Sequence, residues 1–80
     1  MPTILRLDGY RFYFYSHEPN EPWHVHVDKA GCSAKFWLEP VALAGNAGFS
    51  AREIGELLKL VREHQVQFKE AWDGFFGAGR

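Results

Sequence analysis

Four short stretches of the first half of the chain predict strands, and in the last three the side chains alternate between two faces, a pattern typical of strands with one buried face. These stretches are residues 3–7, 10–15, 23–28 and 33–39. Between the first two stands Asp8-Gly9, a pair that favours a two-residue hairpin turn because glycine adopts positive φ at little cost. Lys29-Ala30-Gly31 predicts a second turn. We therefore expect four antiparallel strands.

After residue 50 the period of the apolar residues changes from that of a strand to that of a helix. Ser50 and Glu53 have the spacing of a capping box, which marks a helix start. The apolar residues that follow at intervals of three, four and seven are Ile54, Leu57, Leu58, Val61, Phe68 and Trp72. The spacing predicts one amphipathic helix over about residues 51–73, roughly 35 Å long. Strands of five or six residues span only about 17–20 Å, so the helix end should overhang the sheet.

Together these elements predict a single α+β domain over residues 1–80. Its architecture is a four-stranded antiparallel sheet followed by one long C-terminal helix packed on one face (ββββα). Residues 41–44 are either a short edge strand or an extended lead-in to the helix. The helix must cover the purely apolar face of the sheet, whose members are Phe12, Phe14, Val25, Val27, Phe36 and Leu38.

The opposite face carries the candidate binding residues, because it is rich in aromatic, basic and histidine side chains. They are Arg11, Tyr13, Tyr15, His24, His26, Lys35 and Trp37, joined by Arg6 if the first hairpin keeps its register. Aromatic rings stack on unpaired bases while Arg and Lys meet phosphates, and Tyr and Trp also favour protein interfaces. Three uses stay open: binding nucleic acid, binding a protein, and burial beneath the 16–22 loop or a second copy.

The histidines are the strongest chemical signal in the chain. His24 and His26 stand at positions i and i+2 of a strand, so they share a face with Cα atoms roughly 6.5–7 Å apart. We name both as candidate catalytic residues, because histidine titrates near neutral pH and cleavage of RNA through its 2′-hydroxyl needs acid–base groups. One alternative is a metal site completed by a third ligand. The candidates for that ligand are His17, Glu18, Asp28 and Cys32. The other alternative is a structural role, with both rings held by hydrogen bonds.

Composition narrows the class of protein. The 80 residues carry a net charge of −1, so no overall basic field exists and nucleic-acid binding would need a local patch. A single cysteine excludes an internal disulfide. No apolar run approaches the roughly 20 residues that span a bilayer. We expect a cytoplasmic protein with no membrane partner and no cofactor.

Five spaced motifs point to a family. They are Pro2-Thr3-Ile4-Leu5-Arg6, the run from Gly9 to Ser16, His24-Val25-His26-Val27, Ala34-Lys35-Phe36-Trp37-Leu38 and the run from Gly48 to Glu53. In this order, and over nearly the whole chain, they resemble a family of small bacterial proteins catalogued as domain-of-unknown-function family 4160. The resemblance implies no catalytic residues.

The resemblance also implies a biological setting. Genes of this family commonly stand beside a second small gene, and the pair looks like a toxin–antitoxin module. This implies a cognate small protein partner and, if the chain is the toxin, an action on RNA. With His24 and His26 as the candidate residues from strand geometry, such an activity would be that of a histidine-dependent ribonuclease. A homodimer is a further expectation, because Trp72, Phe75 and Phe76 would extend past the edge of the sheet.

Overall fold

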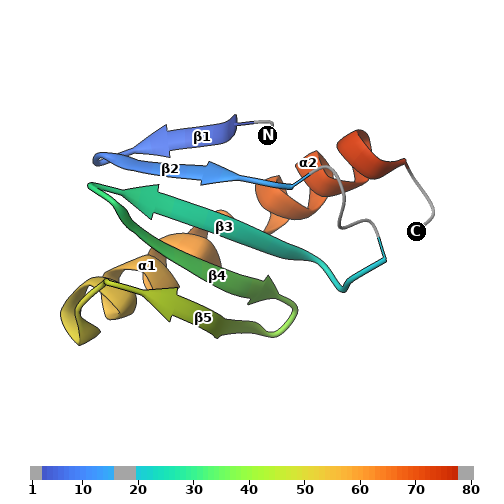
Figure 1. The fold of residues 1–80 in the computed structure, drawn as a ribbon. Helices are drawn as coiled ribbons and strands as arrows, with labels where there is room; N and C mark the ends of the chain where they lie inside the picture. Colours follow the sequence, from blue (N-terminus) through green and yellow to red (C-terminus); the bar gives the residue numbers. More distant parts are fainter. Residues whose placement is uncertain (1–2, 16–19, 78–80) are drawn as a thin grey trace.

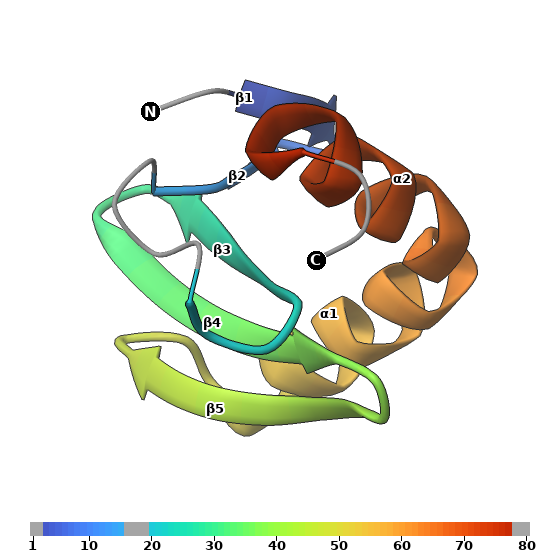
Figure 2. The ribbon, with the colours of Figure 1, turned by 90° about the vertical axis from the view of Figure 1, so that its right-hand side faces the viewer.

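The structure is a computed structural model that describes residues 3–15 and 20–77. Its strands are β1 (Thr3–Leu7), β2 (Tyr10–Tyr13), β3 (His24–Lys29), β4 (Cys32–Leu38) and β5 (Val41–Ala47), and its helices are α1 (Ala51–Glu63) and α2 (Gln65–Phe76). The strands lie side by side in chain order and every neighbouring pair is antiparallel (Figure 1). Figure 2 shows both helices on one side of this sheet. The α+β class and the antiparallel sheet are confirmed.

The sheet has five strands in the described part of the chain, so the prediction of four is wrong. β5 pairs with β4 along its whole length, after a tight turn at Glu39-Pro40 whose peptide bond is cis. The sequence hid this strand because small residues blur the alternation of Val-Ala-Leu-Ala-Gly-Asn-Ala. An irregularity in the pairing, opposite Lys35 and Phe36, also shifts its phase. Of the two alternatives for residues 41–44, the edge strand is therefore the correct one.

Two tight turns connect the first four strands in pairs, β1 to β2 and β3 to β4. Asp8 and Gly9 have φ of 53° and 83°, the positive values that a type I′ hairpin turn requires, which confirms the predicted turn. Ala30 and Gly31 form the second turn with φ of 51° and 81°. Alanine rarely adopts this left-handed conformation because its Cβ approaches the following carbonyl oxygen. The second turn is thus built with a locally unfavourable residue.

The C-terminal half contains two helices, so the prediction of one long helix is also wrong. The start is confirmed: Ser50 Oγ accepts from the Glu53 N–H at 3.1 Å, and Glu53 Oε1 accepts from the Ser50 N–H at 3.0 Å. The break falls at His64, whose backbone (φ −110°, ψ 15°) leaves the helical range. Its ring Nδ1 and its backbone N–H both donate to Leu60 O, at 2.9 Å and 3.1 Å, so the bend is tied to the last turn of α1. His64 is half-buried at this bend rather than a solvated surface residue.

Because the chain bends at His64, α2 packs against the sheet instead of overhanging it. Trp72 is buried against Phe14, with ring centroids 5.1 Å apart, and Phe76 packs on Trp72 at 4.3 Å. Phe75 stays 44% exposed. The prediction of an overhanging aromatic end is therefore wrong, and two of the three residues that suggested a dimer are used inside the protein.

The core lies between the helices and the face of the sheet that was predicted to be apolar. All six predicted members of that face are fully buried: Phe12, Phe14, Val25, Val27, Phe36 and Leu38. α1 adds Leu57 and Val61, and α2 adds Phe68 and Trp72. Within the described residues, neither helix is long and apolar enough to cross a membrane.

Candidate functional site

The register of the sheet brings the predicted binding residues together on the face opposite the helices. Tyr13 pairs with His26, and His26 pairs with Lys35, so one row of side chains crosses three strands. His24 pairs with Trp37 and begins a second row beside the first. We call this side of the sheet the open face. The register puts both histidines on this face, as the strand spacing predicted, although the His24 ring, at the end of β3, also contacts Trp72 of α2.

Three rings form a compact cluster on the open face. Tyr13 and His26 stack with centroids 5.5 Å apart and an interplanar angle of 23°. Tyr15 meets both of them edge-on, at 4.5 Å from His26 and 5.4 Å from Tyr13. The guanidinium of Arg11 covers Tyr13 at 4.6 Å from its ring centroid. Tyr13 is therefore only 3% exposed, although it belongs to the open face.

The phenol of Tyr13 is a fixed hydrogen-bond donor. Its hydroxyl donates to Asp28 Oδ1 at 2.9 Å. Burial raises the pKa of Tyr13 well above the usual 10.0, and hydrogen bonds with Tyr15 and Asp28 raise it further. Tyr13 thus stays neutral through the physiological range and stiffens the cluster rather than serving as an acid.

His24 is built into the protein interior. Its side chain is 0% exposed, and its Nδ1 donates to the carbonyl oxygen of Pro22 at 2.8 Å. Its ring contacts Trp72 at 4.8 Å, His26 at 5.1 Å and Trp37 at 5.8 Å between centroids. The bend at His64 is what lets Trp72 reach this position. Of the two histidines, His26 is the one with a partly exposed side chain.

Acidic residues balance the predicted basic residues of the open face. Lys35 Nζ lies 2.6 Å from Glu21 Oε1 and 4.7 Å from the ring centroid of Trp37. Arg11 Nη1 lies 3.9 Å from Asp28 Oδ2, and Arg6 pairs with Arg11 across the first hairpin, so it shares the face as predicted. The face therefore offers cations that are held in place rather than a large positive field.

A shallow hollow of about 300 Å³ lies beside the ring cluster. Tyr13, Tyr15 and His26 line it from β2 and β3 and the residues that follow β2, and the small residues of β4 and β5 also line it. Gly45 is central to its shape: a Cβ placed there would meet no atom within 4 Å, so the space above β5 is open. A flat or extended group could lie on this floor against the rings.

A family model matches residues 9–73, which is most of the 80-residue chain. The chain belongs to the DUF4160 family, a domain of unknown function. This confirms the family that the five motifs suggested. No curated protein and no solved structure matches the chain, so the site has to be interpreted from its own geometry.

In this DUF4160 chain, the described residues contain no group of three or more His, Cys, Asp or Glu side chains placed to hold a metal ion. His17 and Glu18, two of the candidates for a third ligand, lie outside the described residues. Cys32 pairs with Lys29, so it stands about 10 Å along the strands from the row of His26. Asp28 accepts the hydrogen bond of Tyr13 instead.

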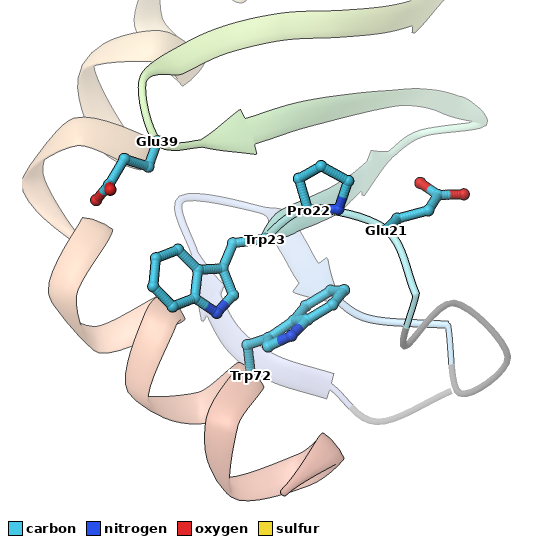
Figure 3. Close-up of a pocket in the computed structure, with 5 residues that line it drawn as sticks. All are labelled: Glu21, Pro22, Trp23, Glu39 and Trp72. Atoms are coloured by element: carbon cyan, nitrogen blue, oxygen red, sulfur yellow. The ribbon is translucent and has the colours of Figure 1, made fainter. Parts of the chain in front are cut away.

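Sequence reasoning missed a second pocket of about 270 Å³ at the end of the sheet. Figure 3 shows the indole rings of Trp23 and Trp72 facing this pocket beneath Pro22. Trp23 Nε1 donates to Asp73 Oδ1 at 3.2 Å, and Lys69 Nζ lies 4.9 Å over the Trp23 ring. Such contacts of α2 with the start of β3 depend on the helix bend, and the prediction of a straight helix concealed them.

Proposed function

We propose that this DUF4160 protein is the binding component of a two-protein bacterial module of the toxin–antitoxin kind, and that its open face holds the cognate small protein. The observation that carries this proposal is the set of partly exposed side chains on that face. They are Tyr15, His26 and Lys35, which line the hollow, and Trp37, which lies in the second row on the same face. Aromatic residues held rigidly by their neighbours bind partners at low entropic cost.

Binding is favoured over catalysis by the unequal burial of the two histidines. General acid–base cleavage of RNA needs two groups that reach the substrate. His24 is 0% exposed and its Nδ1 is committed to Pro22 O, whereas His26 is partly exposed. One accessible histidine supports recognition of a ligand better than a two-histidine ribonuclease.

RNA is the second candidate ligand, and the hollow is the observation that favours it. Tyr15 and His26 present rings beside a floor of small residues, where an unpaired base can stack. However, Glu21 and Asp28 neutralise Lys35 and Arg11, so phosphate binding would be weak. A protein partner is therefore the first candidate ligand and RNA the second. We propose that the protein acts in the cytoplasm.

The test is a binding titration of the purified protein with the product of the adjacent gene. Trp37→Ala and Tyr15→Ala should each weaken binding by about tenfold or more, because Trp and Tyr residues at the centre of an interface typically cost about 2 kcal/mol or more when truncated. Phe75→Ala is the matched control, since it also removes a partly exposed aromatic ring, but from α2. It should leave affinity unchanged.

The outcomes separate the candidates. Binding that survives both open-face substitutions but is lost with Phe75→Ala would contradict the proposal and move the interface to the helices. If the adjacent gene product does not bind, while single-stranded RNA binds with an affinity that depends on Tyr15 and Trp37, the second candidate replaces the first. If neither the adjacent gene product nor RNA binds, the proposal that the open face is a binding surface is refuted.

A further inference from the structure

β5 lies at one edge of the sheet and lacks the charges that usually protect such an edge. Val41–Ala47 contains no charged residue and no proline, and residues 43–47 are exposed. In Figures 1 and 2 no described strand lies beyond β5, while α1 packs against β5 from the helix side of the sheet. An edge strand exposes unpaired N–H and C=O groups, which recruit another strand unless charges, proline or a covering segment prevent it.

The other edge of the sheet differs in charge. Both β1 and β5 have one irregularity in their pairing, so irregular geometry does not distinguish them. β1 carries Arg6, an exposed cation at the fourth of its five residues. The uncharged edge is thus specific to β5.

Side chains on β5 leave room for another strand. On the open face β5 presents Ala42, Gly45 and Ala47, which pair with Trp37, Lys35 and Ser33. On the helix side, Leu43 pairs with the buried Phe36 and is nevertheless 41% exposed. An apolar side chain therefore stands at the rim of the core without full cover.

We propose that β5 pairs in antiparallel fashion with β5 of a second copy about a two-fold axis, so that two five-stranded sheets join into one. In such a pairing a strand meets its own sequence reversed, and a charge near its middle would face its own kind. β5 has no charge to repel its mate in any register, and Leu43 gains the apolar neighbours it lacks. This self-complementarity makes a second copy the occupant.

The second copy also completes the hollow on the open face. In a single chain the hollow has rings towards β2 and β3 but ends at the edge of β5. Joined sheets would place the two β4 strands three strand spacings apart, or about 14 Å. The small residues of both β5 strands then form the floor of one trough, with Lys35 of each copy at its sides. The proposed dimer does not depend on which ligand the trough binds, so the two proposals can be tested separately.

The experiment is a measurement of mass in solution for the untagged full chain, by sedimentation equilibrium over a roughly hundredfold concentration range. We expect twice the 9.2 kDa mass of one chain. Leu43→Lys should weaken association by about tenfold or more, because it brings like charges from the two copies together within the interface. Ala44→Lys, at an exposed position of the same strand, provides a second test should Leu43→Lys lower stability.

Val66→Lys is the matched control, since it makes the same change of charge at a 67% exposed apolar residue of α2. It should leave the dimer intact, and circular dichroism should show all three variants folded. A wild-type protein that is monomeric at every concentration overturns the proposal. So does a dimer that both β5 substitutions leave unchanged, or one that is lost only with Val66→Lys.

Discussion

Replacement of His24 by alanine should destabilise the protein far more than replacement of His26. The His24 ring is fully buried among Trp72, His26 and Trp37, and its Nδ1 donates to Pro22 O at 2.8 Å. Deleting it leaves a cavity and removes the donor to that carbonyl. Large buried rings cost about 3–5 kcal/mol when truncated, and the lost hydrogen bond costs about 0.5–1.5 kcal/mol, because Pro22 is exposed and water can replace the donor. For the smaller imidazole we expect a loss of about 3 kcal/mol in the free energy of unfolding.

Replacement of the partly exposed His26 by alanine should lower the free energy of unfolding much less. Its alanine variant gives up the stack on Tyr13 at 5.5 Å and the edge contact with Tyr15 at 4.5 Å, together about 1 kcal/mol. For a domain of this size, 1 kcal/mol corresponds to a shift of about 4–8 °C in Tm. His24→Ala should therefore lower Tm by about 12–24 °C, and His26→Ala by about 4–8 °C.

Thermal and urea unfolding, followed by the fluorescence of the tryptophans next to His24, measure both values. His24→Phe separates the two contributions, because it keeps a ring of similar size and removes the donor to Pro22 O. It should cost about 0.5–1.5 kcal/mol. Equal losses for the two alanine variants, or a larger loss for His26→Ala, would refute the division into a structural and a binding histidine.

Four further substitutions test the turn at Ala30, two glycines and the dependence of stability on pH. Ala30→Gly should stabilise the protein by about 0.5–1 kcal/mol, since φ is 51° there. A lower free energy of unfolding in urea would contradict the left-handed turn. Gly55→Ala, in α1 with open space around its Cβ, should stabilise by about 0.8–1 kcal/mol. Gly48→Ala should destabilise the protein by more than about 1 kcal/mol. A positive φ of 106° alone costs an alanine about that much, and the new Cβ would also lie 2.9 Å from Cys32 Sγ. If Gly48→Ala and Gly55→Ala changed the stability equally, this explanation would be refuted. Burial raises the pKa of Tyr13, so the folded chain keeps a proton that the unfolded chain loses above about pH 10. Its contribution to stability is thus full below that pH and falls as pH rises further, and Tyr13→Phe should lessen the fall.

Strand alternation was enough to predict the open face. Periodicity placed His24, His26 and Trp37 on the same side, and the register of β3 and β4 confirms it. It could not predict burial, because a pattern of faces does not say what lies above them. Tyr13 is covered by Arg11 and Tyr15, its neighbours along the chain, and also by His26 and Asp28, whose contacts depend on how β2 pairs with β3.

The errors in the predicted fold have two physical causes. β5 lacks apolar alternation because it is an edge strand with small residues, so its pairing with β4 depends on backbone bonds that the side chains do not reveal. Both helices bury apolar residues at helical spacing, Leu57 and Val61 in α1 and Phe68 and Trp72 in α2. The apolar spacing therefore continues through His64 and gives no sign of the bend there. The contacts of Trp72 with His24 and Phe14 follow from that bend.

The most direct test of the open face as the binding surface is an NMR titration of the isotope-labelled protein with the product of the adjacent gene. The largest changes in backbone amide shift should fall on the strands that carry Tyr15, His26, Lys35 and Trp37, with little change around Val66 on α2. Changes concentrated on α1 and α2, with β3 and β4 unaffected, would contradict the proposed function.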